Sequence, residues 1–189
     1  PSGDYGLVTL LRTKNLVPMT RTARGWTISN GLGVVWRDGA EDQVVLDQPN
    51  LGFPDPADVV ITPDGKYALV TSSSTDRVAV LDLAKLIGVI KSASARDREK
   101  VLPNHTGKSV EFTAKYIPTQ NSPRGLTCSA DGVVAYVANA LDDSVTVIDL
   151  NKLEAVGRID LGGPKEITKA RRGERLFNRA NITFRRQFS

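Results

Sequence analysis

The chain has 189 residues, 40% hydrophobic and 24% charged, with a formal net charge of +4. Such a length and composition are typical of a globular protein with a sizeable core, and no apolar run approaches the roughly 18 residues of a membrane helix. Eight basic and two acidic residues lie from Lys165 onward, so this end carries +6 and the preceding residues −2. Because the positive charge is confined to one terminal segment, we expect no nucleic-acid partner.

The chain contains a single cysteine, Cys128, and a single histidine, His105. This count excludes a disulfide, a Cys/His zinc site and a Cys-x-x-Cys-His haem attachment site within these residues. The first residues show neither an initiator Met nor a signal-peptide pattern, so we expect an excised or processed piece.

The first predicted strands lie at residues 25–32 and 34–36. They resemble the more regular strands that follow, and we interpret them as a preceding sheet unit.

Two later stretches are copies of each other. Residues 56–86 and 123–153, offset by 67, share twelve of 31 positions without a gap. The identical residues sit at turns and at alternate apolar positions, where a common backbone demands them. In each copy two short strands flank an Asp-Gly turn, at Asp64-Gly65 and Asp131-Gly132, and a third strand follows a polar turn ending at Asp76 or Asp143.

A fourth strand is predicted at residues 155–161, and Pro164 falls 41 residues after Pro123. This spacing is that of a four-stranded antiparallel propeller blade, which stacks on its neighbours because it cannot bury both faces alone. We therefore predict an all-β fold: a partial β-propeller of about three four-stranded antiparallel blades over residues 1–164, with a short helical C-terminal tail over residues 165–189.

Residues 64–71 and 131–139, with 78–83 and 145–150, resemble the YVTN family of bacterial and archaeal propeller repeats. The resemblance covers about residues 56–164 and implies an exported protein, periplasmic or on the cell surface.

The first copy carries 26 more residues between its third strand and the next unit than the second copy does. We place this insertion at about 87–112 and expect a short helix over residues 83–90. Long insertions on a propeller rim often bind partners; a solvated excursion is the simpler interpretation, and we favour it.

After Pro164 the repeat ends. Thr168 is a candidate N-cap for a helix whose apolar members Ala170, Leu176, Phe177 and Ala180 fall near one side. The run Gly173-Glu174-Arg175-Leu176-Phe177 and the final Ser189 resemble the opening of di-haem cytochrome c peroxidase-like domains. This resemblance implies that such a domain follows Ser189; the alternative is an ordinary helix that caps the last blade.

No catalytic, cofactor-binding or metal-binding residue is assigned within the chain. Cys128 stands where the other copy has Ile61, which indicates a small buried side chain, and His105 is expected on the surface. The repeated aspartates indicate structural turns, because an acid–base pair needs one convergent pocket. We expect Trp26, Trp36 and Tyr136 to pack between blades.

The sequence thus predicts a binding or scaffold segment of an exported, multidomain cytochrome c peroxidase-like protein. Its partners are the adjacent blades and a C-terminal haem domain of the same chain, with a further protein or redox partner left open. Haem c and electron transfer would belong to the domain beyond Ser189. Two alternatives remain: a non-redox adhesion propeller, and a propeller enzyme of the lactonase type.

Overall fold

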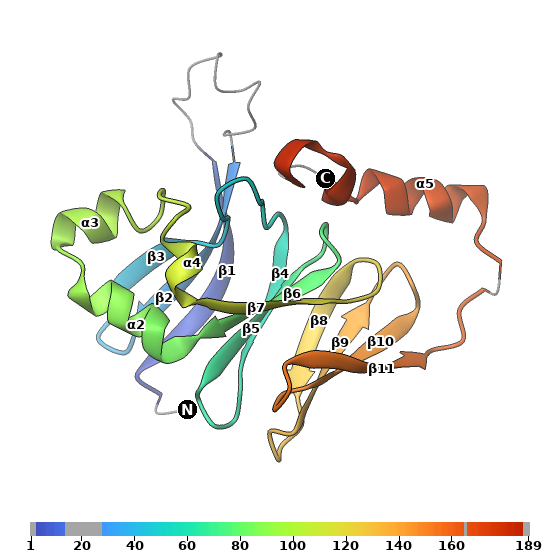
Figure 1. The fold of residues 1–189 in the computed structure, drawn as a ribbon, viewed down its shortest axis with the longest axis horizontal. Helices are drawn as coiled ribbons and strands as arrows, with labels where there is room; N and C mark the ends of the chain where they lie inside the picture. Colours follow the sequence, from blue (N-terminus) through green and yellow to red (C-terminus); the bar gives the residue numbers. More distant parts are fainter. Residues whose placement is uncertain (1–2, 14–27, 165, 187–189) are drawn as a thin grey trace.

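A computed structural model describes residues 3–13, 28–164 and 166–186. The described chain forms three antiparallel sheets (Figure 1). Sheet 1 contains β1 (Tyr5–Thr13), β2 (Ile28–Trp36) and β3 (Glu41–Val45). Sheet 2 contains β4 (Pro56–Ile61), β5 (Tyr67–Ser72), β6 (Arg77–Asp82) and β7 (Thr113–Pro118). Sheet 3 contains β8 (Pro123–Cys128), β9 (Val134–Asn139), β10 (Ser144–Asp149) and β11 (Glu154–Asp160).

The two sequence copies fold alike. The first three strands of sheets 2 and 3 begin and end at the same offset of 67 residues. Both Asp-Gly turns place glycine at positive φ, 71° at Gly65 and 70° at Gly132. The amide of Lys66 donates to Asp64 Oδ1, and the amide of Val133 donates to Asp131 Oδ1, each over 3.0 Å. The repeat is therefore one backbone module used twice.

The copies are also neighbours in space. β4 packs beside β8, and the side chains of Leu69, Val78, Val80 and Ile117 on one face of sheet 2 form a core with Ala135, Val137 and Ile148 of sheet 3. The opposite face of sheet 2, with Ala68, Val70 and Leu81, joins the core of sheet 1. This face-to-face stacking of successive sheets is the propeller arrangement that the sequence predicts.

In the part of the chain that the structure describes, sheet 1 has three strands and lacks the innermost strand of a blade. β1 pairs with β2 in the register Tyr5↔Trp36, as β5 pairs with β6 at Tyr67↔Asp82. β1 also packs against β4, as β5 packs against β8. The strand β1 thus corresponds to the second strand of the other two sheets. Of the strands predicted for this unit, residues 28–32 and 34–36 lie in β2, and residues 25–27, with Trp26, fall outside the described residues.

The expectation of a solvated insertion at 87–112 is wrong. The segment forms helices that contribute buried side chains to the core of sheets 1 and 2, namely Leu86, Ile90, Leu102 and Phe112. These helices are α2 (Leu83–Ser92), α3 (Ala95–Lys100) and α4 (Ser109–Phe112). The amide of Val45 in β3 donates to the carbonyl of Leu102 over 3.0 Å, and Arg98 lies 3.5 Å from Asp42. The insertion therefore packs against β3, the edge strand of sheet 1, and is not a solvated excursion on the rim.

The outer face of sheet 3 has no partner among the described residues. Tyr136 is 37% exposed and Ile159 is 47% exposed, although the corresponding side chains of sheet 2, Leu69 and Ile117, are buried. Within the described ranges no other sheet covers Tyr136, so the packing between blades that we predict for it is not seen there. Trp36 does pack in the core, 5.6 Å from the ring of Tyr5.

Candidate docking face for the tail

The tail, residues 166–186, crosses one end of the sheets (Figure 1). It comprises α5 (Lys169–Phe177), η1 (Ala180–Ile182) and η2 (Phe184–Arg186). Thr168 caps α5, as predicted, by accepting a hydrogen bond from the Arg171 amide over 3.1 Å. Beneath the tail lie the turns that join the second and third strands, residues 72–76 in sheet 2 and 139–143 in sheet 3, together with the loops that enter β4 and β8.

The two turns end on repeated aspartates in the left-handed region, with φ of 53° at Asp76 and 46° at Asp143. Aspartate tolerates this conformation better than most residues, because its short carboxylate bonds nearby backbone. The Asp76 carbonyl accepts from the Thr119 amide and the Asp143 carbonyl from the Leu161 amide, both over 2.9 Å. The backbone of each aspartate therefore holds a turn of its own blade in place, the structural role that the sequence predicts. The carboxylate of each aspartate points to partners outside that turn.

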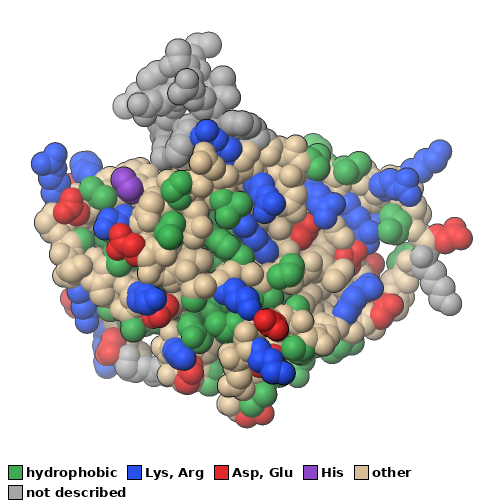
Figure 2. Space-filling model, viewed as in Figure 1, with side chains coloured by type: hydrophobic (Ala, Val, Ile, Leu, Met, Phe, Trp, Pro, Cys, Tyr) green, Lys and Arg blue, Asp and Glu red, His purple; other side chains and the backbone are tan. Residues whose placement is uncertain are grey.

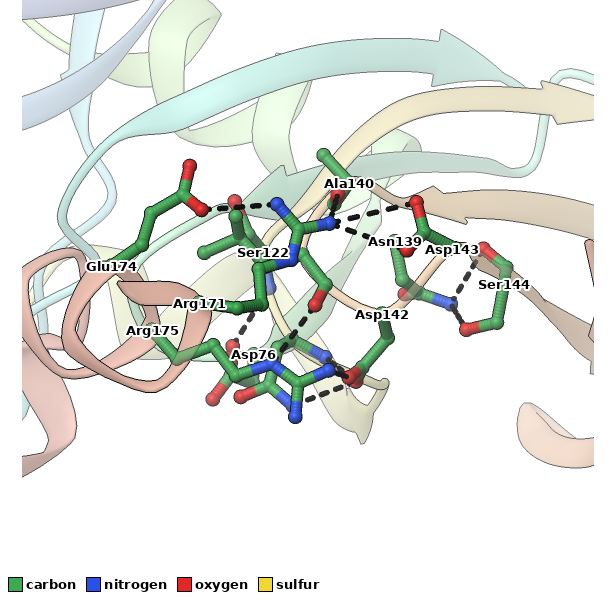
Figure 3. A network of polar contacts seen from close by, with 12 residues as sticks. Asp76, Ser122, Asn139, Ala140, Asp142, Asp143, Ser144, Arg171, Glu174 and Arg175 are labelled. Atoms are coloured by element: carbon green, nitrogen blue, oxygen red, sulfur yellow. Dashed lines mark hydrogen bonds and ion pairs between the residues drawn. The ribbon is translucent and has the colours of Figure 1, made fainter. Parts of the chain in front are cut away.

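Arginines of the tail contact these carboxylates, and Figure 3 shows Arg171 beside Asp143. Arg179 Nε lies 3.1 Å from Asp76 Oδ2, and Arg171 lies 3.4 Å from Asp143 Oδ2. The Asp142 carboxylate forms an ion pair with Arg175 and is largely buried. Arg171 and Arg175 are one helical turn apart, so both reach down from the same side of α5.

The carboxylates of Asp76 and Asp142 also tie the tail to the loop between sheets 2 and 3. Asp76 Oδ1 accepts from the Ser122 amide over 2.9 Å, and Asp142 Oδ2 accepts from the amide and the side chain of Asn121, each over 2.6 Å. Each carboxylate thus joins a blade, a connecting loop and an arginine. A charged acceptor shared in this way is worth more than an isolated surface pair.

Backbone contacts hold the remainder of the tail. The amide of Ala180, which is buried, donates to the carbonyl of Ser74 over 2.8 Å. The amide of Gly52, in the loop before β4, donates to the carbonyl of Arg185 over 2.8 Å. A side chain at Gly52 would overlap the carbonyl of Arg186, so the close approach of the chain end requires glycine here.

A buried cation supports the Gly52 loop. Arg77 Nη2 donates to the Gly52 carbonyl over 2.5 Å, and its guanidinium lies 4.3 Å from the centre of the Tyr116 ring and 5.4 Å from that of Phe53. Burial lowers the pKa of Arg77 to about 10, so the side chain stays protonated at neutral pH. The corresponding residue of the other copy is Ser144, which makes this support specific to sheet 2.

A cleft of about 1080 Å³ separates α5 and its connector from sheet 3. Its walls carry charges of both signs, including Asp142, Asp160, Glu166, Arg158 and Arg175. Figure 2, which has the same viewpoint as Figure 1, shows basic side chains gathered over α5 and the surface beneath it. Ion pairs join α5 to sheet 3 across this polar cleft.

The single histidine and the single cysteine of the chain lie elsewhere. His105 is exposed, as expected, in the insertion. Cys128 is half-buried against the core between sheets 2 and 3, and burial, then Asp64, raises the pKa of its thiol. Among the described residues no three His, Cys, Asp or Glu side chains are grouped so as to hold a metal ion. In the same part of the chain, no helix has the length and apolarity to cross a membrane.

The sequence reasoning missed the docking face because it assigned the repeated aspartates to turns alone. The available signal was the spacing of Arg171, Arg175 and Arg179, four residues apart, against a net negative charge in the rest of the chain. Which blade residues they meet depends on the direction in which the chain turns after Pro164, and that is a tertiary property.

Comparison with known proteins gives one informative relative. No family model matches the chain. Over 150 residues it is 27% identical to a hydrazine synthase subunit beta from Kuenenia stuttgartiensis, covering 78% of this chain and 39% of that protein. The solved structure of Kuenenia stuttgartiensis hydrazine synthase superposes with a TM-score of 0.72 at 27% identity, over 78% of this chain and 42% of that one. This chain is similar to a hydrazine synthase subunit.

The chain spans about two fifths of the length of that relative. A periplasmic gluconolactonase from Pseudomonas aeruginosa gives a TM-score of 0.48 at 21% identity, over 72% of this chain and 37% of that one. Three stacked antiparallel sheets, together with the likeness to the hydrazine synthase structure, establish a propeller-like fold.

Proposed function

We propose that this chain is the propeller segment of an exported multidomain redox protein, and that it binds and positions a haem-carrying domain beyond Ser189. Electron transfer would reside in that domain, and the propeller would supply the rigid surface on which it is held. The likeness to a subunit of hydrazine synthase supports a role in a multi-component enzyme.

One observation carries the proposal. α5 is fastened to the propeller by Arg171 and Arg175, and it turns the Gly173-x-x-Leu176-Phe177 side away from the propeller. An ordinary capping helix would bury its apolar side on the blades and expose its charges. This helix has the opposite orientation, which suits a segment that joins two folded bodies.

The proposal is tested on the full-length gene product, expressed in a host that attaches haem c and exports the protein. We expect a haem-staining band at the full-length mass, a periplasmic location, and a Cys-x-x-Cys-His sequence soon after Ser189. A full-length protein without haem, whose chain continues with further Asp-Gly strand units, would contradict the proposal. That result would favour the adhesion or lactonase-type alternatives.

A further inference from the structure

The tail has an apolar surface that the propeller does not use. We call this the outer surface of the tail and define it by Ala170, Gly173, Leu176, Phe177 and Ile182. All five are exposed, Phe177 at 80% and Leu176 at 50%. In α5, Gly173 lies three residues after Ala170 and four before Phe177, so these residues share the side of the helix opposite the arginines.

This exposure is not a consequence of a loosely held tail. The amides of Ala180 and Gly52 and the carboxylates of Asp76 and Asp142 fix the segment on its inner side. The outer surface is therefore held in one orientation. A fixed cluster of exposed apolar residues marks an interaction surface, whereas apolar residues scattered singly do not.

The shape and charge of this surface indicate what fits it. A side chain at Gly173 would meet nothing within 4 Å, and Ala170 beside it is small, so a partner can approach the helix backbone between the larger Leu176 and Phe177. Exposed Lys169, Arg172 and Arg186 lie in the same segment. Figure 2 shows basic and apolar side chains side by side along this edge of the molecule. The surface suits an apolar partner with an acidic rim.

We infer that the outer surface of the tail is the binding surface for the domain that continues the chain beyond Ser189. This rests on the proposed function. The last described residues are themselves anchored at Gly52, and η2 packs against η1, so a continuing chain would leave the propeller next to the tail. The tail is then a two-sided adaptor, with arginines toward the propeller aspartates and apolar side chains toward the following domain.

The test uses the full-length protein and trypsin, which cleaves after Lys169 and Arg172 only when these sites are accessible. Phe177→Asp places a charge in the centre of the outer surface. We expect cleavage at these sites to become roughly tenfold faster while haem content is unchanged, because the covering domain detaches locally. Val133→Asp is the matched control, since Val133 is also an exposed apolar residue but lies at the Asp-Gly turn of sheet 3.

Ala170→Gln is the second variant. It keeps a strong helix former and adds bulk where the partner approaches without adding a trypsin site, so it should act like Phe177→Asp even if the latter folds poorly. Unchanged cleavage in a haem-loaded Ala170→Gln protein overturns the inference. A wild-type full-length dimer that either substitution converts to a monomer would also overturn it, in favour of a second copy. Absence of haem from the wild-type protein is a failure of the proposed function instead.

Discussion

Asp76 and Asp143, 67 residues apart in sequence, occupy the same left-handed turn position in successive sheets and bind different arginines of one tail. Asp76 also accepts the Ser122 amide of the next blade's entry loop. At Asp143 the side chain of Arg171 lies against the carboxylate, and Gly163 passes so close that any side chain there would overlap it. The tail thus meets sheet 3 where a following blade's loop meets sheet 2.

The charge of Asp76 can be removed without disturbing the turn. Asp76→Asn keeps a residue that tolerates positive φ and an oxygen that accepts the Ser122 amide, but it loses the ion pair with Arg179. In the full-length protein we expect the free energy that holds the tail on the propeller to fall by about 1 kcal/mol. The tail then detaches more often, and trypsin should cleave faster after Arg179. Asp131→Asn, at an exposed turn without a tail contact, should leave the cleavage rate at the wild-type value.

Gly52 provides a steric test of the same docking. Gly52→Ala should displace the chain end from its seat at a cost of about 1–3 kcal/mol, because the added methyl group overlaps the Arg186 carbonyl. Gly88→Ala, on the exposed side of α2 with nothing within 4 Å, should instead stabilise the protein by about 0.5–1 kcal/mol. Denaturant unfolding of both variants checks the opposite signs. A Gly52→Ala protein as stable as wild type would show that the end of the tail is not held there.

The Asp-Gly turns predict a pH effect at two equivalent positions. Hydrogen bonds from Ser129 and the Val133 amide lower the pKa of Asp131, and those from Thr62 and the Lys66 amide lower the pKa of Asp64. A pKa lowered by folding contributes stability that is complete above the ordinary aspartate pKa and is lost as pH falls through the folded value. Ser129→Ala should therefore raise the pKa of Asp131 toward its ordinary value.

Carboxyl NMR titration measures this shift directly. Thr62→Val should do the same to Asp64, and each variant is the control for the other, because the two turns do not share these hydrogen bonds. If Asp131 titrates at the same pH with and without the Ser129 hydroxyl, the turn geometry described here is wrong.

The open face of sheet 3 predicts how the isolated segment behaves. Residues 1–189 expressed alone should associate through exposed blade faces, and light scattering should report oligomers. Tyr136→Lys, which places a charge on this face, should reduce the association. Leu69→Ala, at the corresponding buried position of sheet 2, should instead destabilise the fold by about 2–5 kcal/mol. A monodisperse, cooperatively melting wild-type segment would contradict the account of the open face.

The sequence predicted the repeated sheets because their turns and cores are local patterns. The turns at Asp64-Gly65 and Asp131-Gly132 require glycine at positive φ. The alternation of apolar residues through Val78 and Val80 places every second side chain on the same face of the sheet. The position of β1 as a second strand was not predicted, because it depends on pairing with β2 across residues 14–27 and on packing against β4.

The burial of the insertion and the docking of the tail were beyond local patterns as well. Leu86, Ile90 and Leu102 have helical or irregular surroundings that fit a core or a surface equally, and contact with β3 decides between them. In the sequence, the arginines of the tail are indistinguishable from a solvated face. Only the folded structure places Asp76, Asp142 and Asp143 opposite them. Contacts between distant segments are the part that a single sequence leaves open.

Hydrogen exchange at the Ala180 amide tests the central claim, a tail docked on repeated turn aspartates, most directly. This amide donates to the Ser74 carbonyl across the interface and is buried only while the tail is docked. In the full-length protein the account predicts slow exchange at Ala180, becoming faster in Asp76→Asn and Gly52→Ala. Exchange at the rate of an unstructured chain in the wild-type protein would contradict it.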